Sequence, residues 1–424
     1  MSENIFVLGL DEHNHETLNA LPHFTDYRFH PLLDLEKLQN SEDIDIPALL
    51  AQAQERLDSF DGSIDAIIGY WDFPVSSMVP ILCQRYGLPA SPLEAVVKCE
   101  HKYWSRLEQR EVITEIPGFA EIEPGTKGKP NDLDYPLWLK PVKAFSSELA
   151  FRVTNDTEFR EALAEVHEGA GRVGEPFEFV MNQVEMPAKV TQAGGSACLA
   201  EEEATGDQVT VEGYVYKGEV RVYGVIDSEC YPGTSSFQRY QYPSSLPEDV
   251  TDHLAEISRR VIARLGLDSV TFNIEYFVDS ESGRITLLEV NPRHSQSHAK
   301  LFEFVDGMPN HECVVRLALG QEPELTHGGG EYAVAGKCFL RHFEDGFVSR
   351  VPTADEVARI EADHPGTTIK VVAHEGENLS DLPSQDSYSY ELAQVFIGAA
   401  DQAELNRTYE SCVEALPFQI DAPR

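Results

Sequence analysis

Two apolar runs late in the chain, Thr271–Val278 and Ile285–Arg293, each carry a glutamate, and a turn-rich hexapeptide separates them. Apolar runs joined by a short polar turn predict a β-hairpin. If this hairpin is symmetric about Ser282, Glu275 lies opposite Glu289, because each is seven residues from that centre. Directly opposed carboxylates lie roughly 5 Å apart and repel each other. Such a pair inside apolar strands indicates that a cation lies between the two acids.

The residues around the two glutamates extend this pattern. Asn273 and Asn291 face each other one step along on the same side of the predicted hairpin, because side chains two apart share a face. A ligand set of Glu275, Glu289 and Asn291, without His or Cys, favours Mg2+ or Mn2+ over zinc. Arg293 follows at once and is a donor suited to phosphate or carboxylate oxygens. The alternative is a solvated acidic hairpin edge, but both acids stand inside apolar runs.

On these residues the chain resembles the ATP-grasp superfamily. The stretch Phe272–Gly307 contains Glu-Val-Asn-Pro-Arg-His-Ser-Gln-Ser-His at 289–298, which matches the Glu-x-Asn-Pro-Arg pattern of that superfamily. The resemblance implies an α/β (α+β) chain with an ATP-grasp fold, a Rossmann-like N-terminal pre-ATP-grasp domain and a C-terminal domain like that of biotin carboxylase. It also implies an enzyme that binds ATP between two sheets and phosphorylates a carboxylate with Mg2+ (or Mn2+), two ions being expected.

The first segment of the chain alternates strand and helix patterns. This order predicts a small open parallel sheet. The first strand ends in Gly9-Leu-Asp-Glu instead of G-x-G-x-x-G, so the dinucleotide-binding fingerprint is absent. The expected strands lie at 5–10, 27–30 and 66–70, and the expected helices at about 47–60 and 75–86.

Two lysines precede the hairpin at positions that the resemblance assigns to the ATP phosphates. Lys102 lies in a helix predicted over 93–111, and Lys140 ends an apolar strand. A charged lysine at the end of a buried strand is costly unless it has a partner, whereas Lys102 has the alternative of a solvated surface position. Ser146 and Ser147 stand where many relatives have a glycine-rich phosphate loop. Their hydroxyl and backbone N–H groups suit phosphate oxygens.

An acid-rich strand end resembles the adenine hinge of the superfamily. In that hinge, backbone groups hold the adenine ring, and an acid seven residues beyond the first Glu holds the ribose. The resemblance assigns Glu201, Glu202 and Ala204 to the hinge and Gln208 to the ribose position, where relatives usually have Glu. Gln still offers hydrogen bonds to a ribose hydroxyl, although they are not charge-assisted.

The segment Tyr231–Tyr242 mixes glycine, hydroxyl groups, aromatic rings and one arginine. It resembles the Ser-x-Gln-Arg segment of biotin-carboxylase-like ATP-grasp enzymes, so Arg239 is expected to bind an oxyanion or a substrate carboxylate. The alternative is an aromatic-rich surface loop. Lys337, on a strand predicted after the Gly328-Gly-Gly linker, matches a basic residue that points at the acceptor site in those relatives. Together with Arg293, these two residues are the predicted catalytic groups.

The chain thus divides into three predicted domains. The N-terminal domain spans 1–92, the nucleotide-binding domain 93–327 with a lid at about 137–205, and the β-rich C-terminal domain 331–424. In the last domain we expect strands at 331–341 and 389–398 and a helix at about 401–415.

Composition limits the partners and the setting. With 33 basic and 72 acidic residues the formal charge is −39, which argues against nucleic acid because phosphate contacts need basic surface. No apolar stretch approaches about 18 residues and no signal-peptide pattern is visible, so we expect no membrane partner. The seven cysteines form no C-x-x-C pair, which fits a reducing cytoplasm. We expect a homodimer, and either a salt-rich cytoplasm or an ordinary acidic enzyme.

Two enzymatic interpretations remain open. In the first, a carboxylate–amine ligase forms an acyl phosphate that a small-molecule amine attacks, with ADP released. In the second, a biotin-carboxylase-like enzyme makes carboxyphosphate from bicarbonate. A nucleotide-binding regulatory protein without catalysis conflicts with the complete set of lysines, glutamates and arginine. His294 and His298 are candidate bases for the amine, although a lone histidine is more often structural.

Overall fold

The N-terminal part of the chain forms a small open sheet. The computed structural model describes residues 2–21, 25, 27–39, 44–144, 149–382 and 389–424. Strand β1 (Glu3–Leu8) lies between β2 (Tyr27–Leu33) and β3 (Ala66–Ile68) and pairs with both in parallel, which confirms the predicted sheet. The helices of this part are α1 (Glu12–Asn19), α2 (Leu35–Gln39), α3 (Ile46–Asp58) and α4 (Val75–Tyr86).

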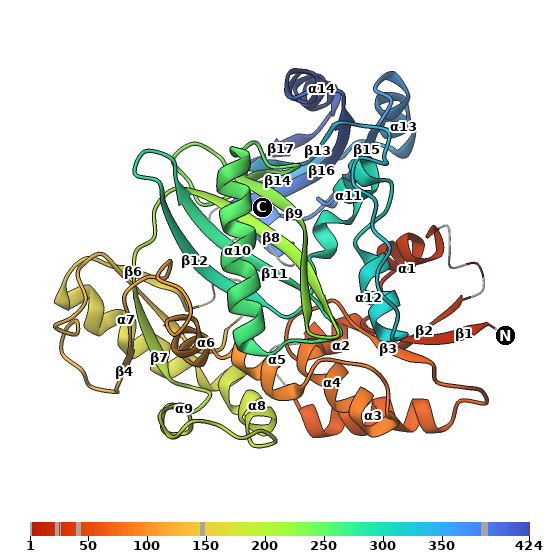
Figure 1. Cartoon of the computed structure of the whole chain (residues 1–424). Helices are drawn as coiled ribbons and strands as arrows, with labels where there is room; N and C mark the ends of the chain where they lie inside the picture. The colour runs from red at the N-terminus through yellow and green to blue at the C-terminus, as the bar shows by residue number, and fades with distance from the viewer. Residues whose placement is uncertain (1, 22–24, 26, 40–43, 145–148, 383–388) are drawn as a thin grey trace.

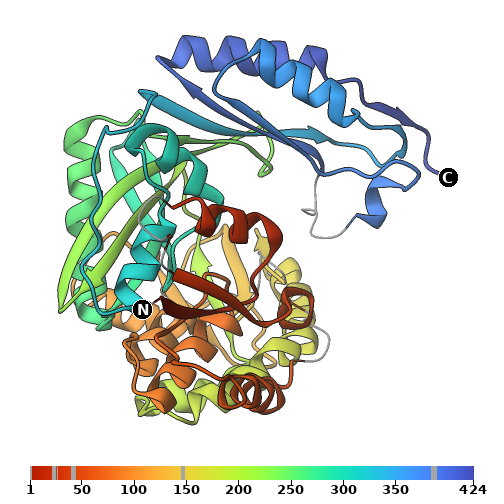
Figure 2. The ribbon, with the colours of Figure 1, turned by 90° about the vertical axis from the view of Figure 1, so that its right-hand side faces the viewer.

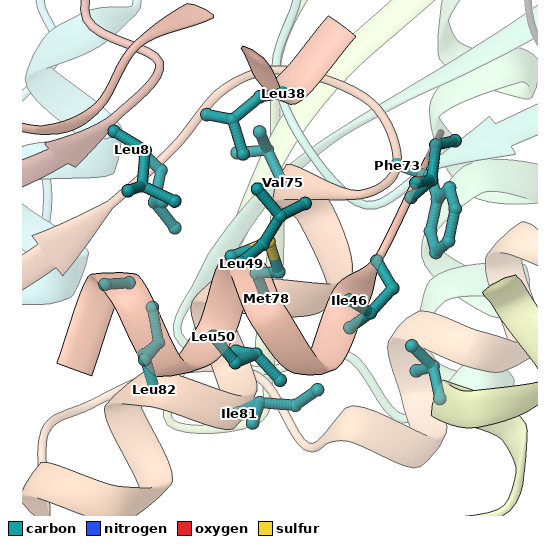
Figure 3. Packing of buried hydrophobic residues seen from close by; sticks show 14 of the residues in the cluster. Leu8, Leu38, Ile46, Leu49, Leu50, Phe73, Val75, Met78, Ile81 and Leu82 are labelled. Atoms are coloured by element: carbon teal, nitrogen blue, oxygen red, sulfur yellow. The ribbon is translucent and has the colours of Figure 1, made fainter. Parts of the chain in front are cut away.

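Helix α3 shows how the sequence determines this N-terminal core. Asp45 caps its start by accepting a hydrogen bond from the backbone N–H of Ala48 at 3.0 Å. Figure 3 shows Leu49 and Leu50 of α3 beside Met78 of α4. Burying each leucine contributes roughly 1.5–3 kcal/mol. The buried side chains of α3 recur at helical spacing: Ile46, Leu49, Leu50, Ala53 and Leu57.

One predicted helix is two helices in the structure. The chain breaks at His101 into α5 (Leu93–Glu100) and α6 (Lys102–Gln109), so the prediction of a single helix was wrong. The backbone of His101 is extended, and its Nδ1 accepts a hydrogen bond from Trp104 N at 3.2 Å, which caps α6. The spacing of apolar residues does not reveal that one helix ends and the next begins within the same helical pattern. The break places Lys102 in the first turn of α6.

A second sheet has four antiparallel strands in the order β4-β7-β5-β6. It includes a strand that precedes the predicted start of the lid. One face packs on α7, whereas α8 and α9 contribute side chains to the N-terminal core. The elements are β4 (Phe119–Ile122), β5 (Leu137–Pro141), β6 (Phe151–Val153), α7 (Asp156–Gly169), α8 (Gly171–Met181), α9 (Ala188–Ala193) and β7 (Cys198–Glu202).

The largest sheet has eight strands and crosses the boundary between the second and third predicted domains. Its order is β12-β11-β8-β9-β10-β13-β16-β15, so β10 and β13 join the two parts. Helix α10 packs on the face opposite the two glutamates (Figure 1). The elements up to this junction are β8 (Asp207–Tyr216), β9 (Glu219–Cys230), β10 (Phe237–Tyr242), α10 (Glu248–Leu265), β11 (Val270–Asp279), β12 (Arg284–Asn291), the 3-10 helix η1 (Gln296–His298), α11 (Ala299–Asp306) and α12 (His311–Ala318).

The C-terminal part continues the same sheet and carries its own helices. Figure 2 shows the blue C-terminal strands with their helices on one side and the red helix α1 toward the other. No helix among the described residues combines the length and apolarity needed to cross a bilayer. The elements are β13 (Val334–His342), β14 (Phe347–Arg350), α13 (Ala354–Asp363), β15 (Thr367–Val371), η2 (Leu379–Asp381), β16 (Tyr390–Ala399), α14 (Gln402–Ala415) and β17 (Gln419–Asp421). The two strands and the helix predicted here are confirmed as β13, β16 and α14.

Candidate active site

The hairpin β11–β12 has the predicted register at its acidic pair. Glu275 is opposite Glu289, and the two asparagines one step along are also opposite each other. Nearer the turn the register differs: Tyr276 pairs with Leu287, so Leu288 is an extra residue, a β-bulge. The opposition of the two glutamates therefore depends on this bulge, which the sequence pattern did not reveal.

Arg106 of α6 holds the bulge in place. Its Nη2 donates to the carbonyl oxygen of Leu288 at 2.6 Å, and its Nε donates to Glu201 Oε1 at 2.6 Å. On the other side of the bulge, the N–H of Leu287 donates to the carbonyl of Glu115 at 2.8 Å. Arg106 is only 3% exposed, so a buried guanidinium ties the hairpin to the four-stranded sheet.

The two opposed carboxylates have different electrostatic surroundings. Burial would raise the pKa of Glu289, but Lys102, whose Nζ lies 2.7 Å from its Oε1, lowers that pKa to about 2. Burial and the charge of Glu289 raise the pKa of Glu275 to about 7, although Arg293 opposes this rise. Glu275 accepts a hydrogen bond from Gln208 Nε2 at 2.9 Å. Among the described residues, Glu289 thus has a cation in direct contact, and Glu275 has neutral donors.

The donor chemistry around Glu275 fits a hard divalent cation. Asn291 Nδ2 donates to Asn273 Oδ1 at 2.8 Å and lies 3.4 Å from Glu275 Oε1, so the amide is beside both carboxylates. In the described ranges no three His, Cys, Asp or Glu side chains gather as metal ligands. A metal here would be held by two carboxylates, an amide and the oxygens of a bound ligand, which is a common arrangement for Mg2+.

Lys140 and Arg106 share the buried carboxylate of Glu201. Lys140 Nζ lies 2.6 Å from Oε2, and Arg106 Nε lies 2.6 Å from Oε1. Burial would raise the pKa of Glu201, but these two cations lower it to about 2. Lys102 and Lys140 both lower the pKa of Glu289 as well. The structure therefore places Lys102 in contact with Glu289 and Lys140 in contact with Glu201, and the charges of both lysines act on Glu289.

A third lysine in this region escaped the sequence prediction. Lys143 is 6% exposed, lies 3.4 Å from Glu100 Oε2 and also lowers the pKa of Glu289. The sequence feature that could have indicated Lys143 is its position three residues after Lys140. Ser146 and Ser147 lie outside the described residues.

The predicted adenine hinge lies at the end of β7. The carboxylate of Glu201 belongs to the ion-pair network, and the backbone N–H of Glu202 donates to Gly118 O at 2.9 Å. Ala204 lies beyond the end of the strand, so it is the first of the predicted hinge residues outside β7. The structure places Gln208 against Glu275, at the edge of the acidic site. The adenine and ribose assignments stay predictions.

Arg293 reaches across to the N-terminal part of the chain. Its Nε and Nη2 donate to the two carboxylate oxygens of Asp72, each at 2.8 Å. The sequence analysis missed Asp72. Its position shortly after β3 could have indicated it, because residues that follow the carboxyl ends of parallel strands commonly line ligand sites.

Lys337 and Arg239 lie on opposite faces of the large sheet. Strand pairing places Tyr240 opposite Lys337, whereas Arg239 is opposite Cys338. Alternation across β8, β9 and β10 puts Lys337 on the face of Glu275. Arg239 is on the other face, away from Glu275, and its expected role as a clamp for an oxyanion or a substrate carboxylate stays a prediction. Its guanidinium donates to Glu229 at 2.7 Å and to Asn406 of α14 at 2.6 Å. The Ser-x-Gln-Arg pattern alone does not predict on which face of the sheet the arginine lies.

Lys337 is a buried ammonium, only 5% exposed. Its Nζ donates to Ser297 Oγ at 3.0 Å and lies over the ring of Phe339 at 5.1 Å. Burial, together with the like charges of Lys370 and Arg341, lowers its pKa to about 8. A buried cation with cationic neighbours is suited to bind an anionic group.

The two candidate histidines have different surroundings. His294 is fully buried, its Nδ1 lies 3.3 Å from Thr271 Oγ1, and its ring is 5.0 Å from that of His311. Burial and His311 lower the pKa of His294 well below its usual range, which favours its neutral form. His298 instead has its Nδ1 2.7 Å from a carboxylate oxygen of Glu212.

Comparison with known proteins agrees with this architecture. Residues 133–299 match the family model of the ATP-grasp domain. The carbamoyl phosphate synthase large chain of Clavibacter sepedonicus is 37% identical over 68 residues, which is 16% of this chain and 6% of that relative. The chain has the ATP-grasp fold and carries a domain of the ATP-grasp family.

Solved structures share the fold over nearly the whole chain. An L-amino acid ligase from Bacillus licheniformis has a TM-score of 0.71 at 14% identity, over 100% of this chain and 99% of that one. A phosphoribosylglycinamide synthetase from Anaerococcus prevotii has a TM-score of 0.69 at 12% identity, over 99% and 100%. A biotin carboxylase from Campylobacter jejuni has a TM-score of 0.65 at 14% identity, over 99% and 93%.

Proposed function

We propose that the protein is an ATP-dependent carboxylate–amine ligase that releases ADP. It activates a carboxylate as an acyl phosphate and transfers the acyl group to an amine, as in amino-acid or peptide-type amide formation. The observation that carries this proposal is the opposed pair of Glu275 and Glu289. Lys102 contacts Glu289, and Arg293 lies two residues beyond the end of β12. Oxygen ligands and cations on one surface are what a Mg2+–polyphosphate complex needs.

Each residue of the site has a role in this proposal. Glu275, Glu289 and Asn291 would hold Mg2+ (or Mn2+), as two ions, which would neutralise part of the phosphate charge. The ammonium groups of Lys102 and Lys140 bind phosphate oxygens in place of their carboxylate partners. The guanidinium of Arg293 stabilises the charge on the transferred phosphoryl group. Ala204, with Glu201 and Glu202 before it, forms the adenine hinge, Gln208 contacts the ribose, and Ser146 and Ser147 contact the phosphates.

Lys337 defines the other end of the site. It shares the sheet face of the acidic pair, it is buried, and Ser297 links it to the loop of Arg293. We propose that its ammonium binds an anionic group of the carboxylate or amine substrate, while the ring of Phe339 contacts the apolar part. An amino-acid substrate offers both features.

The alternative is a biotin-carboxylase-like enzyme that acts through carboxyphosphate. The similarity to biotin carboxylase over nearly the whole chain favours it, and the similarity to the L-amino acid ligase favours the ligase. Phosphate release from ATP and Mg2+ distinguishes the two. Release that requires a mixture of L-amino acids supports the ligase, and release that requires bicarbonate alone contradicts it.

The proposed partners are small molecules, a carboxylate and an amine, with no nucleic acid and no membrane. We propose a homodimer in the cytoplasm. All seven cysteines are free and six of them are buried, which suits a reducing compartment. Light scattering at micromolar concentration tests the dimer, and a monomer mass at the highest concentration contradicts it.

A further inference from the structure

A buried carboxylate organises the loop that follows Arg293. Glu212 is fully buried on β8, opposite Asn273 and on the face of the acidic pair. It accepts hydrogen bonds from Tyr223 Oη at 2.6 Å, Asn310 Nδ2 at 2.9 Å and Ser295 N at 3.1 Å. Three donors from three different segments thus converge on one carboxylate, whose oxygens act as acceptors.

The fourth partner of Glu212 is His298. Its Nδ1 lies 2.7 Å from Glu212 Oε1, an oxygen that also accepts from Ser295 N, so Nδ1 carries the hydrogen of this bond. Nε2 is then left with its lone pair. Nε2 of His294 is sealed in the interior without a partner, whereas Nε2 of His298 is not among the sealed polar atoms of the described chain. A carboxylate that fixes the tautomer of a histidine is the usual support of a general base.

The position of His298 lies between the two ends of the proposed site. Its preceding residue, Ser297, accepts the hydrogen bond of Lys337. Its ring meets the ring of Tyr240 edge-on at 5.0 Å. Tyr240 is in turn near enough to Glu275 for that charge to affect the hydroxyl. The imidazole therefore contacts two residues, Glu212 and Tyr240, on the sheet face that carries Glu275, and it follows directly the serine that binds Lys337.

We propose that His298, oriented by Glu212, is the general base that deprotonates the amine nucleophile; this inference rests on the proposed ligase function. His298 Nε2 takes one proton from the substrate ammonium, and the freed nitrogen lone pair forms a C–N bond with the acyl carbon. The tetrahedral adduct collapses as the C–O bond to phosphate breaks, and the phosphate leaves with that electron pair. The second proton on nitrogen goes to the departing phosphate.

Hydroxylamine separates this step from acyl phosphate formation, because it is a nucleophile that is already unprotonated at neutral pH. The assay uses ATP, Mg2+ and an equimolar mixture of the standard L-amino acids, with and without hydroxylamine. In His298→Asn, the amide can still donate to Glu212. Amide formation between amino acids is expected to fall about 100-fold or more at neutral pH. Hydroxamate formation is expected to stay within about threefold of wild type, and amide formation to recover as pH rises.

Controls make each outcome decisive. His374→Asn changes an exposed histidine and is expected to leave both reactions unchanged. Equal losses of amide and hydroxamate in His298→Asn, or no loss of amide, overturn the assignment of the base. If His298→Asn does not fold, Glu212→Gln carries the test: a selective loss of amide formation supports the pair, and an equal loss overturns it. Wild type that forms neither hydroxamate nor amide contradicts the ligase itself.

Discussion

Arg293 and Asp72 form a two-pronged ion pair that joins the Asn-Pro-Arg loop to the N-terminal domain, with both N–O distances at 2.8 Å. The guanidinium is the group proposed to face the phosphoryl oxygens. An incoming anion therefore competes with Asp72 for the same donors. This competition couples substrate binding to the contact between the two parts of the chain.

Arg293→Lys tests the role of this guanidinium. A lysine keeps the charge but cannot make two parallel hydrogen bonds. The kcat of phosphate release is expected to fall by about 10²–10³. Asp72→Asn is the matched control, because it removes the ion pair and leaves the arginine. Its stability is expected to change by at most about 1 kcal/mol, since Asp72 is half-exposed. If Asp72→Asn reproduced the full loss of kcat, the role of Arg293 would be only to hold the domains together.

Glu289→Gln tests the metal assignment. The variant removes one charged ligand, so Mg2+-dependent protection by ATP analogues is expected to disappear from thermal melts. In the wild type, nucleotide at about 100 times its Kd adds about 2.7 kcal/mol of stability. Glu281→Gln, in the exposed turn of the same hairpin, is the control and is expected to behave as wild type. Unchanged Mg2+-dependent turnover in Glu289→Gln would falsify the site.

Arg106→Met tests the support of the β-bulge. The substitution leaves the buried carboxylate of Glu201 with one cation fewer and the carbonyl of Leu288 without its donor. Breaking a buried pair in this way is expected to cost about 3–5 kcal/mol of unfolding free energy in urea. Arg152→Met is the matched control, because Arg152 lies at the surface and exposed ion pairs such as its pair with Glu203 add little to stability. Equal costs for the two variants would contradict the structural role of Arg106.

Much of the fold was predictable because it depends on local patterns. Alternation predicted the parallel sheet and the acidic hairpin, and counting from Ser282 predicted the opposition of Glu275 and Glu289, which the structure reaches only through the bulge at Leu288. The break at His101 was not predictable, because the sequence around a histidine that caps a helix does not differ from the sequence around a histidine inside a helix. The bulge at Leu288 depends on Arg106, a residue far away in the sequence.

The site was predicted less completely than the fold. Motif matching selected Lys102, which the structure places in contact with Glu289, and Lys140, which it places in contact with Glu201, and the phosphate-binding role of both lysines stays a prediction. It missed Asp72 and Glu212, because their roles come from partners that only the tertiary structure brings near. The sheet face on which Arg239 lies was not predictable, because the face of a strand residue follows from pairing with several neighbouring strands.

Lys337 gives the site a pH dependence. Burial lowers its pKa to about 8, so in the folded protein the ammonium is present below pH 8 and is lost as pH rises through that value. The KM for the anionic substrate is therefore expected to rise above pH 8. Lys337→Arg retains its charge throughout this range and is expected to abolish the rise. A wild-type KM that stays constant from pH 7 to pH 9.5 would contradict the role of the ammonium in binding.

The formal charge of −39 predicts that screening stabilises the protein. Repulsion among surface carboxylates acts over about 10 Å at 0.1 M salt and about 3 Å at 1 M salt. The melting temperature and the rate of phosphate release are therefore expected to rise as KCl increases from low concentration to about 1 M. Sucrose at equal osmolality is the control, because it does not screen charge. Values that stay unchanged between low salt and molar KCl would remove the argument for a salt-rich cytoplasm, and the acid excess would then belong to an ordinary acidic enzyme.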